Sequence, residues 1–273
     1  MNEYLNYLYV AIRAAIDAGS AIMAIYDNPE EDIAVELKAD NSPLTKADKQ
    51  AHKIISIILS ATPFPVLSEE GEIVPFAERS SWKTLWIVDP LDGTKEFIKR
   101  NGEFTVNIAL VEGGIPVLGV IYIPVYKELY FATKSLGAYK LNGISGIIQP
   151  SVNDIIAKAI RLPNASAHQG IVVAVSRSYL NEETMAYIDD LRRQGQPVTL
   201  ISSGSSMKIC FVAEGSADIY PRFAPTMEWD TAAGHAIACA AGCQIYHTDE
   251  KTPLSYNKED LHNPWFIVKS QKA

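Results

Sequence analysis

The chain has 273 residues, of which 48% are hydrophobic, so it can bury a large core as one domain or as two fused halves. Its formal net charge of −8 argues against a nucleic-acid polymer as partner, although a small phosphorylated nucleotide beside a bound cation stays possible. The sequence shows no uninterrupted apolar run of about 18 residues and no basic segment ahead of an apolar start, so we expect neither a transmembrane segment nor a signal peptide.

The first half of the chain predicts two helices packed on a mostly antiparallel sheet. Apolar side chains recur at helical spacing over residues 4–26, and a second helical stripe runs from about residue 46 to the prolines near residue 63. Residues 30–40 and 72–84 are polar and predict loops or an exposed hairpin. Residues 65–68 predict a short strand that leads to Glu69. Apolar runs separated by a glycine pair and a proline predict three consecutive strands joined by hairpins, at 105–111, 116–123 and 128–133.

The pattern changes after about residue 150, where apolar strands alternate with helical stripes. This alternation is typical of an α/β unit. We therefore predict an α/β protein with two tightly packed parts, an α+β part over residues 1–155 and an α/β part over residues 156–273. The expected strands are 171–175, 198–201, 217–220, 244–247 and 265–268, and the expected helices are 181–194, 205–214 and 230–242.

The segment that follows the apolar run 85–88 carries most of the candidate chemistry. The run predicts a buried strand that ends at Asp89, because a proline follows at once. Asp92 comes three residues later, so two carboxylates at the mouth of one strand can share a hard cation. Gly93 and Thr94 follow, and their amides can begin a helix and face an anion. The segment therefore predicts a metal and a phosphate held side by side.

Four acidic residues stand where a predicted element begins or ends. Oxygen ligands of this kind suit Mg²⁺, which prefers carboxylates, water and substrate phosphate. The alternative is that each acid is only a helix N-cap or a turn former. The close pair of aspartates before Gly-Thr favours the metal interpretation. The four acids are Glu69, Asp89, Asp92 and Asp230.

Three motifs stand far apart in the chain: Ser68-Glu69-Glu70, Asp89-Pro90-Leu91-Asp92-Gly93-Thr94 and Glu228-Trp229-Asp230-Thr231-Ala232-Ala233-Gly234. In this order, and over nearly the whole chain, they resemble the inositol monophosphatase superfamily of Mg²⁺-dependent, lithium-sensitive phosphatases. The resemblance implies a layered α/β/α/β/α sandwich. It also implies hydrolysis of a phosphate monoester by direct attack of water.

The residues after Thr94 narrow the resemblance. This chain reads Lys95-Glu96-Phe97 where inositol monophosphatases usually read Thr-Asn-Phe. Together with the segments 176–178, 204–208 and 220–223, this is similar to the bacterial 3'(2'),5'-bisphosphate nucleotidase branch. That branch hydrolyses adenosine 3',5'-bisphosphate to AMP and phosphate, and the sulfated 5'-phosphosulfate relative fits the same site. The partner implied is a small nucleotide bisphosphate.

The resemblance also implies roles for the acids and for the Gly-Thr pair. Two or three Mg²⁺ ions are expected. Glu69, Asp89 and the carbonyl of Leu91 would hold one ion, and Asp89, Asp92 and Asp230 would hold a second. The amides of Gly93 and Thr94 would bind the scissile phosphate, and Asp48 with the Thr94 hydroxyl would activate the attacking water.

Asp48 has two interpretations. Its spacing alone places an acid in the first turn of a helix, where the helix dipole favours it. Residues 42–48, however, match the family pattern Ser-Pro-x-Thr-x-Ala-Asp, and this match gives Asp48 a catalytic role.

Substrate contacts are expected from the same cluster and from groups further along the chain. Each basic residue could instead be an ordinary surface charge or a helix cap. This alternative is weaker for Lys208, because Gly204-Ser205-Ser206 precedes it at a predicted helix start, where an anion can bind. The residues expected in the cluster are Glu69, Leu91, Asp92, Gly93, Thr94 and Asp230. The further candidates are Lys95, Arg177, Ser205, Ser206, Lys208 and Arg222.

The sequence leaves two alternative functions. One is an inositol- or sugar-phosphate phosphatase of the same superfamily, against which Lys95-Glu96-Phe97 counts. The other is a non-catalytic protein that binds metal or nucleotide, which the intact acids and Thr94 disfavour. The sequence carries no signal of oligomeric state.

The cysteines bear on the compartment. Cys210, Cys239 and Cys243 lack metal-ligand spacing and predict buried thiols, which suits a reducing environment. We therefore expect a cytoplasmic protein. The family resemblance adds peripheral association with the cytoplasmic face of the inner membrane.

Overall fold

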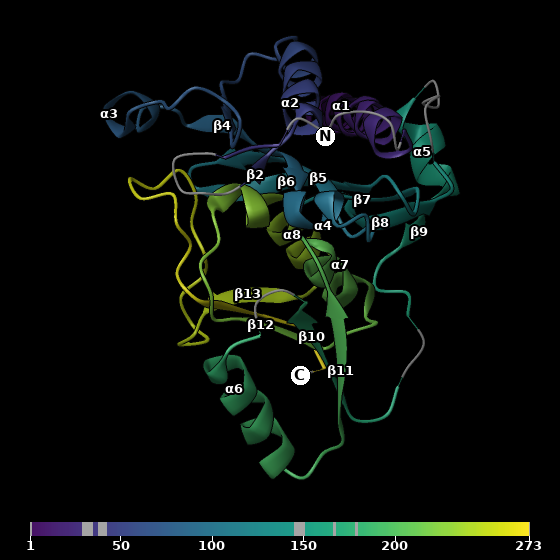
Figure 1. The fold of residues 1–273 in the computed structure, drawn as a ribbon, viewed down its shortest axis with the longest axis vertical. Coiled ribbons are helices and arrows are strands. Elements are labelled where there is room, and N and C mark those ends of the chain that lie inside the picture. Colours follow the sequence, from purple (N-terminus) through teal and green to yellow (C-terminus); the bar gives the residue numbers. More distant parts are fainter. Residues whose placement is uncertain are drawn as a thin grey trace.

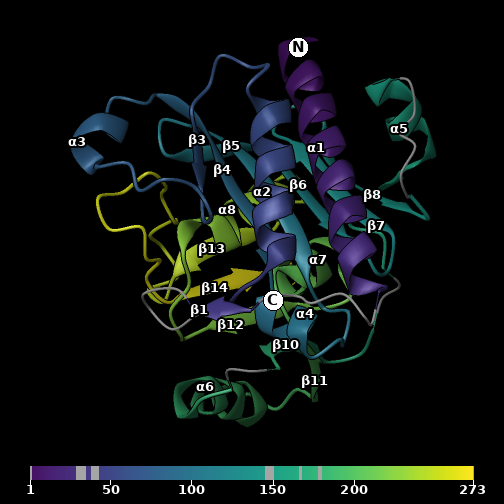
Figure 2. The same cartoon turned by 45° about the horizontal axis from the view of Figure 1, so that its top comes forward.

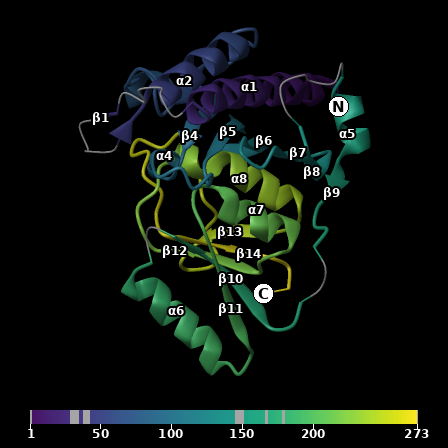
Figure 3. The same ribbon diagram turned by 45° about the vertical axis from the view of Figure 1, so that its right-hand side comes forward.

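The computed structural model describes residues 2–28, 35–37, 43–144, 151–165, 168–177 and 180–272, and these build alternating layers (Figure 1). Helices α1 (Asn2–Tyr26) and α2 (Lys46–Leu59) cover one face of a seven-stranded sheet. Helices α7 (Met207–Glu214) and α8 (Glu228–Ala240) separate that sheet from a five-stranded one, and α6 (Glu182–Arg193) covers its far face (Figure 3). The predicted α/β/α/β/α sandwich is confirmed.

The seven-stranded sheet has the strands in sequence order. All neighbouring pairs are antiparallel except β3 and β4, which run parallel. The hairpins expected from the glycine and proline signals are confirmed. The strands are β3 (Val66–Ser68), β4 (Thr84–Asp92), β5 (Thr105–Glu112), β6 (Ile115–Ile123), β7 (Glu128–Thr133), β8 (Gly137–Asn142) and β9 (Ile160–Arg161).

The five-stranded sheet has the order β11-β10-β12-β14-β13. Strand β10 runs parallel to β11 and β12, whereas β14 is antiparallel to both of its neighbours. The alternation of strands and helices expected in this part is therefore present. The strands are β10 (Ile171–Ser176), β11 (Val198–Ser203), β12 (Ile219–Arg222), β13 (Gln244–His247) and β14 (Phe266–Lys269).

The remaining elements are short. One of them corrects the expectation that residues 72–84 are irregular, because α3 (Phe76–Arg79) begins after Pro75, whose carbonyl accepts from the amides of the first helical turn. Four residues are too few to show a helical period. Of the expected loop or hairpin at 30–40, the described residues form β1 (Glu36–Leu37), which pairs with β2 (Pro43–Leu44). The others are α4 (Thr94–Ile98) and α5 (Val152–Lys158).

Helix α1 is long and apolar enough, by length and composition, to cross a membrane, and no other helix in the described ranges is. Arg13 and Asp17 interrupt its apolar residues, so it contains no uninterrupted apolar run of about 18 residues. Over its most apolar 18 residues 56% of the positions are buried inside the protein, where the helix packs on α2 and the central strands (Figure 2). Leu8, Ile12 and Ile16 are fully buried, each worth about 1.5–3 kcal/mol of hydrophobic stabilisation. In this structure α1 is part of the protein core.

Strand β4 continues to Asp92, so the expectation that it ends at Asp89 is wrong. Asp89 pairs with Asn107 and Asp92 pairs with Thr105, with a register shift between the two pairs. Two residues of β4 therefore stand opposite one residue of β5, as in a β-bulge. Pro90 lies within this irregularity, where the regular ladder is already interrupted and a proline is tolerated.

Helix α8 crosses the inner face of the seven-stranded sheet at Gly119 of β6, where a Cβ atom would clash with the carbonyl of Ala233. Glycine at this position lets the backbones approach closely. The helix contacts β4 to β8, although in the chain it lies between β12 and β13 of the second sheet. The division at residues 155 and 156 stays a prediction.

The thiol prediction is correct at two positions and wrong at the third. Cys210 and Cys243 are buried, whereas Cys239 is exposed. Cys239 lies in the last turn of α8, next to residues that are themselves partly exposed. All three cysteines are free.

Candidate active site

The parallel pair β3 and β4 brings the first two acids to one edge of the sheet. Ser68 lies beside Val88, and the amide of Glu69 donates to the Val88 carbonyl at 3.1 Å. Glu69 therefore follows the last residue of β3 directly beside Asp89, which remains in β4 and pairs with Asn107. The parallel pairing of these two strands brings the two acids next to each other.

Three of the four predicted acids converge. One carboxylate oxygen from each of Asp89, Asp92 and Asp230 lies within 4.8 Å of the others. Asp230 is the third residue of α8, not its first, and its Oδ2 accepts from the amide of Met227 at 2.8 Å. Glu69 lies outside this trio but lines the same cavity.

The converging carboxylates repel one another. Burial and the charges of Glu69, Asp92 and Asp230 raise the pKa of Asp89 well above its usual range. Burial, with Asp92 and Glu69, raises the pKa of Asp230 to about 8. Without a cation, this repulsion favours protonation of Asp89 and Asp230. A divalent cation would take the place of these protons and neutralise the carboxylates. The all-oxygen donor set therefore fits a hard cation of the Mg²⁺ type.

Asp48 contributes one carboxylate oxygen to its own helix and the other to the site. Its Oδ2 accepts from the amide and the hydroxyl of Thr45, at 2.8 and 2.5 Å, and this contact caps α2. Its Oδ1 lies 3.1 Å from Oγ1 of Thr94. Burial raises the pKa of Asp48. Asp48 can therefore cap helix α2 with one oxygen and serve the proposed catalytic role with the other.

The turn before Thr94 needs glycine. Gly93 has a φ of +96°, a left-handed conformation, and a Cβ atom would lie 3.0 Å from the Glu103 carbonyl. Thr94 is the first residue of α4, and its hydroxyl also lies 3.3 Å from the carbonyl of Leu91. The predicted phosphate-binding amides and the predicted carbonyl ligand are thus adjacent.

These groups surround a cavity of about 380 Å³ between the two sheets. Asp48, Asp89 and Leu91 are almost fully buried, each with 1% exposure, and support its wall from behind. Ser42 and Ser178, which belong to two of the recognised patterns, lie outside the described residues. The predicted residues that line the cavity are Glu69, Asp92, Gly93, Thr94, Lys95, Ser205, Ser206, Lys208, Arg222 and Asp230.

Lys208 reaches the cavity from inside the protein. It is 3% exposed, and its Nζ donates to the carbonyls of Ser203 and Ser205, at 3.2 and 2.5 Å, above the ring of Tyr220. Burial lowers its pKa to about 8, although the charge of Asp92 opposes this shift. Lys208 is therefore a cation held in place by the backbone of the preceding turn.

Ser205 adopts a positive φ of +43°, and its buried Oγ has no hydrogen-bond partner among the described residues. Arg222 lines the same wall and donates to the carbonyl of Pro225 at 3.0 Å. Arg177, in contrast, is not brought into the lining. Its guanidinium binds both carboxylate oxygens of Glu103, at 2.6 and 2.8 Å, so its expected substrate contact is not supported.

Several residues near the cavity were not predicted from the sequence. Glu103 also accepts from the amide of Gly204 at 2.8 Å and so links the two halves at the cavity rim. Thr105 and Asn107 lie directly behind the trio on β5. No local signal distinguishes these residues from their neighbours, and only the cross-strand register shows which residues of β5 lie opposite the acids.

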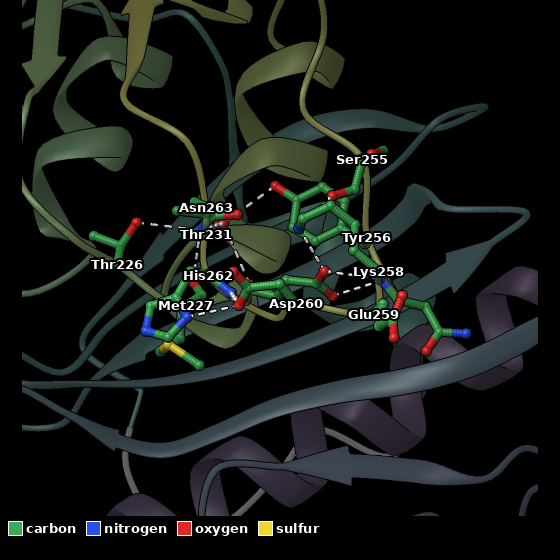
Figure 4. Close-up of polar contacts among 12 residues, drawn as sticks. Thr226, Met227, Thr231, Ser255, Tyr256, Lys258, Glu259, Asp260, His262 and Asn263 are labelled. Atoms are coloured by element: carbon green, nitrogen blue, oxygen red, sulfur yellow. Dashed lines mark hydrogen bonds and ion pairs between the residues drawn. The ribbon is translucent and has the colours of Figure 1, made fainter. Parts of the chain in front are cut away.

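The segment between β13 and β14 holds the first turn of α8 (Figure 4). Nδ2 of Asn263 donates to the carbonyl of Met227 at 2.7 Å. Glu228, which is fully buried, accepts from the amide of Lys258 at 3.0 Å and from its Nζ at 2.5 Å. The first turn of α8, which contains Asp230, is therefore held by Asn263 and by Lys258.

Comparison with known proteins agrees with this geometry. A model of the inositol monophosphatase family matches residues 3–272. A 3'(2'),5'-bisphosphate nucleotidase CysQ from Salmonella typhimurium is 46% identical over 257 residues, which cover 93% of this chain and 96% of that protein. A CysQ from Haemophilus influenzae is 32% identical over 98% of this chain and 93% of its own length.

Solved structures share the fold. The crystal structure of CysQ from Bacteroides thetaiotaomicron, described as a bacterial member of the inositol monophosphatase family, is 57% identical with a TM-score of 0.93, and each chain covers 100% of the other. The extragenic suppressor protein suhB from Bartonella henselae is 26% identical with a TM-score of 0.71, over 96% of this chain and 93% of that one.

Proposed function

Because the chain belongs to the inositol monophosphatase family, we propose that it is a Mg²⁺-dependent 3'(2'),5'-bisphosphate nucleotidase, like the CysQ proteins it resembles. It removes the 3'-phosphate of adenosine 3',5'-bisphosphate to give AMP and phosphate. The observation that carries the proposal is the convergence of Asp89, Asp92 and Asp230 near the Thr94–Asp48 hydrogen bond, at the wall of one cavity that Asp92, Thr94 and Asp230 line.

The metal assignment rests on the donor set. Asp89, Asp92 and Asp230 would hold one Mg²⁺, and Glu69, Asp89 and the Leu91 carbonyl would hold another. Such cations neutralise charge on a phosphate and lower the pKa of the water they bind. The three carboxylates lie close together, and burial together with their mutual repulsion raises the pKa of Asp89, which supports a bound cation at this place.

Thr94 and Asp48 orient the attacking water. The Thr94 hydroxyl donates its proton toward Oδ1 of Asp48, which leaves an oxygen lone pair of Thr94 to accept from water. Asp48 cannot turn away, because its Oδ2 is bound by the amide and the hydroxyl of Thr45. Asp48 then serves as the proton acceptor, and water attacks phosphorus directly without a phosphorylated enzyme.

The second phosphate of the substrate needs cations away from the metal site. Lys208, Arg222 and the unpartnered hydroxyl of Ser205 line the wall of the cavity beside Asp230. Charge-assisted hydrogen bonds from such groups suit a phosphate. Lys95 lines the cavity near the Gly93 turn and is a further candidate.

A phosphate-release assay tests the proposal. We expect release from adenosine 3',5'-bisphosphate that requires Mg²⁺, stops on chelation and falls on addition of Li⁺, with little release from inositol 1-phosphate. The reverse substrate preference would favour the inositol-phosphate alternative. Absence of release from either substrate with Mg²⁺ would favour a non-catalytic binding protein.

We further propose that the enzyme acts in the cytoplasm. Its three cysteines are free, as expected in a reducing compartment, and its apolar N-terminal helix is packed into the core. Fractionation of cells that express the full chain should place it in the cytosol, and a membrane-bound fraction released by high salt would indicate peripheral association.

A further inference from the structure

A relay of buried polar side chains lies directly behind Asp92. It consists of Thr105, Asn107 and Ser206, which are 0, 1 and 3% exposed. The Thr105 hydroxyl donates to Oδ1 of Asn107 at 2.8 Å. Nδ2 of Asn107 donates to Oγ of Ser206 at 2.9 Å and lies 3.3 Å from Oδ2 of Asp92. Oγ of Ser206 lies 2.6 Å from that same oxygen.

The relay has a direction set by its donors. Because Thr105 donates to the carbonyl oxygen of the Asn107 amide, the NH₂ group of that amide faces Asp92 and Ser206. The Ser206 oxygen accepts from Asn107, so its own proton points to Oδ2 of Asp92 or to the carbonyl of Asp230, which is 2.7 Å away. The relay therefore binds two of the three converging aspartates.

Both contacts to the Asp92 carboxylate fall on one oxygen. Oδ2 accepts from Ser206 and Asn107, whereas Oδ1 receives neither of these donors. The relay is rooted in the sheet, because Thr105 and Asn107 stand opposite Asp92 and Asp89 across the β-bulge. The carboxylate is thus held from two sides, by Asn107 on strand β5 and by Ser206, the N-cap residue of helix α7.

We propose that this relay restricts Asp92 to one-oxygen coordination and thereby makes the site select Mg²⁺ over Ca²⁺. The inference rests on the proposed function only in taking the trio as the metal site. Ser206 lines the cavity and was expected as a substrate contact, but its hydroxyl is already bound by Asn107, Asp92 and the Asp230 carbonyl. In this proposal Ser206 and Asn107 therefore act as positioning residues for Asp92.

The physical reason is the difference between the two cations. Mg²⁺ demands near-ideal octahedral geometry at about 2.0–2.1 Å, whereas Ca²⁺ takes about 6–8 oxygens at about 2.3–2.6 Å and accepts carboxylates through both oxygens. Turning Asp92 to present both oxygens would break the contacts of Oδ2 with Ser206 and Asn107 in a buried place. The relay therefore penalises the coordination that Ca²⁺ favours and leaves that of Mg²⁺ intact.

Calorimetric titration of metal-free protein with Mg²⁺ and then with Ca²⁺ tests this without any turnover. In Ser206→Ala we expect the Mg²⁺ dissociation constant to rise about tenfold, as is typical when a partner of a metal ligand is removed. The Ca²⁺ constant should stay level or fall, so the preference shifts toward Ca²⁺. Equal changes in both constants, or no change in either, would overturn the proposal.

The matched control is Ser203→Ala. Ser203 is also buried, at 2% exposure, but its hydroxyl faces the Gly204 carbonyl at 3.4 Å and none of the acids. Its ratio of Mg²⁺ to Ca²⁺ affinity should equal that of the wild type, and a shift as large as that of Ser206→Ala would overturn the proposal. Ser206→Thr keeps the hydroxyl and should restore the ratio.

A second variant guards against misfolding of the first. Thr105→Val preserves shape and removes only the donor that orients Asn107, so it should shift the ratio in the same direction but less. The proposal fails if folded Thr105→Val keeps the wild-type ratio of Mg²⁺ to Ca²⁺ affinity and Ser206→Ala is either unfolded or also unchanged in this ratio. If the wild type binds Mg²⁺ and hydrolyses the bisphosphate but the variants keep its selectivity, only the relay is refuted. Wild-type protein that does neither refutes the proposed function.

Discussion

Oγ1 of Thr94 lies 3.1 Å from Oδ1 of Asp48, a residue 46 positions earlier in the chain. The contact joins the first turn of α2 to the first residue of α4, on opposite sides of the sheet edge that carries the acids. It makes one carboxylate both a helix cap and a candidate proton acceptor. Substitutions can separate these two roles.

Asp48→Asn should abolish most turnover while leaving the fold intact. The amide oxygen can still accept from Thr45, but the side chain can no longer take a proton, so kcat should fall about 10²- to 10⁴-fold. Steady-state phosphate release and thermal unfolding measure the two effects. Thr94→Ser keeps the hydroxyl and is the control with near-normal turnover. A loss of less than tenfold in Asp48→Asn would remove Asp48 from the catalytic pair.

Asp92→Asn should weaken metal binding and turnover together. A neutral amide is a poorer Mg²⁺ ligand than a carboxylate, and a metal contributes several kcal/mol of charge stabilisation, so we expect at least about a 100-fold loss. Calorimetric titration with Mg²⁺ and phosphate release at saturating Mg²⁺ check this. Near-normal activity at high Mg²⁺ would show that Asp92 is not a ligand.

Lys208→Met should impair only substrates that carry a second phosphate. A charge-assisted hydrogen bond is worth about 1.5–3 kcal/mol, so KM for adenosine 3',5'-bisphosphate should rise about 10- to 100-fold. Adenosine 3'-monophosphate should react as in the wild type. Lys53→Met, on the exposed side of α2, is the control. Wild-type kinetics with the bisphosphate would reject the assignment of Lys208.

The stability of the metal-free protein should fall as pH rises. The pKa of Asp230 is raised from its ordinary value of 3.8 to about 8, and that of Asp89 is also raised, so the folded state binds more protons than the unfolded state across this window. The slope of unfolding free energy against pH is then negative. The Tm without metal should drop between about pH 6.5 and pH 8, above the range in which His52 and His235, whose pKa values are lowered by burial, act in the opposite direction. Mg²⁺ should raise Tm more at pH 8. A Tm that rises with pH would contradict this.

Lys258→Met should destabilise the fold by about 1–3 kcal/mol, because the Glu228 carboxylate remains fully buried after losing a charged partner. The backbone amides of residues 257 and 258 still bind it and limit the loss. Urea unfolding of the metal-free protein gives the difference. Lys251→Met, at an exposed turn of the same segment, is the control and should leave stability unchanged.

Local patterns predicted most of the elements. Helical stripes and glycine or proline punctuation mark α1, α2 and the hairpins β5 to β7, because these signals act over a few residues. They failed where longer-range contacts decide. Strand β4 passes through Pro90 because a β-bulge in its pairing with β5 interrupts the regular ladder there, and Arg177 binds Glu103 instead of lining the cavity.

The sequence alone predicted the oxygen ligands and the Gly-Thr turn, because three short motifs in order resemble one family, and it marked Lys208 at a helix start. Only the tertiary structure decided how these motifs meet. Strand register places Asn107 and Thr105 behind the aspartates, and the α7–α8 layer brings Ser206 onto Asp92. Register and layer packing depend on contacts between segments that no local period encodes, so the supporting residues of the site emerge only from the fold.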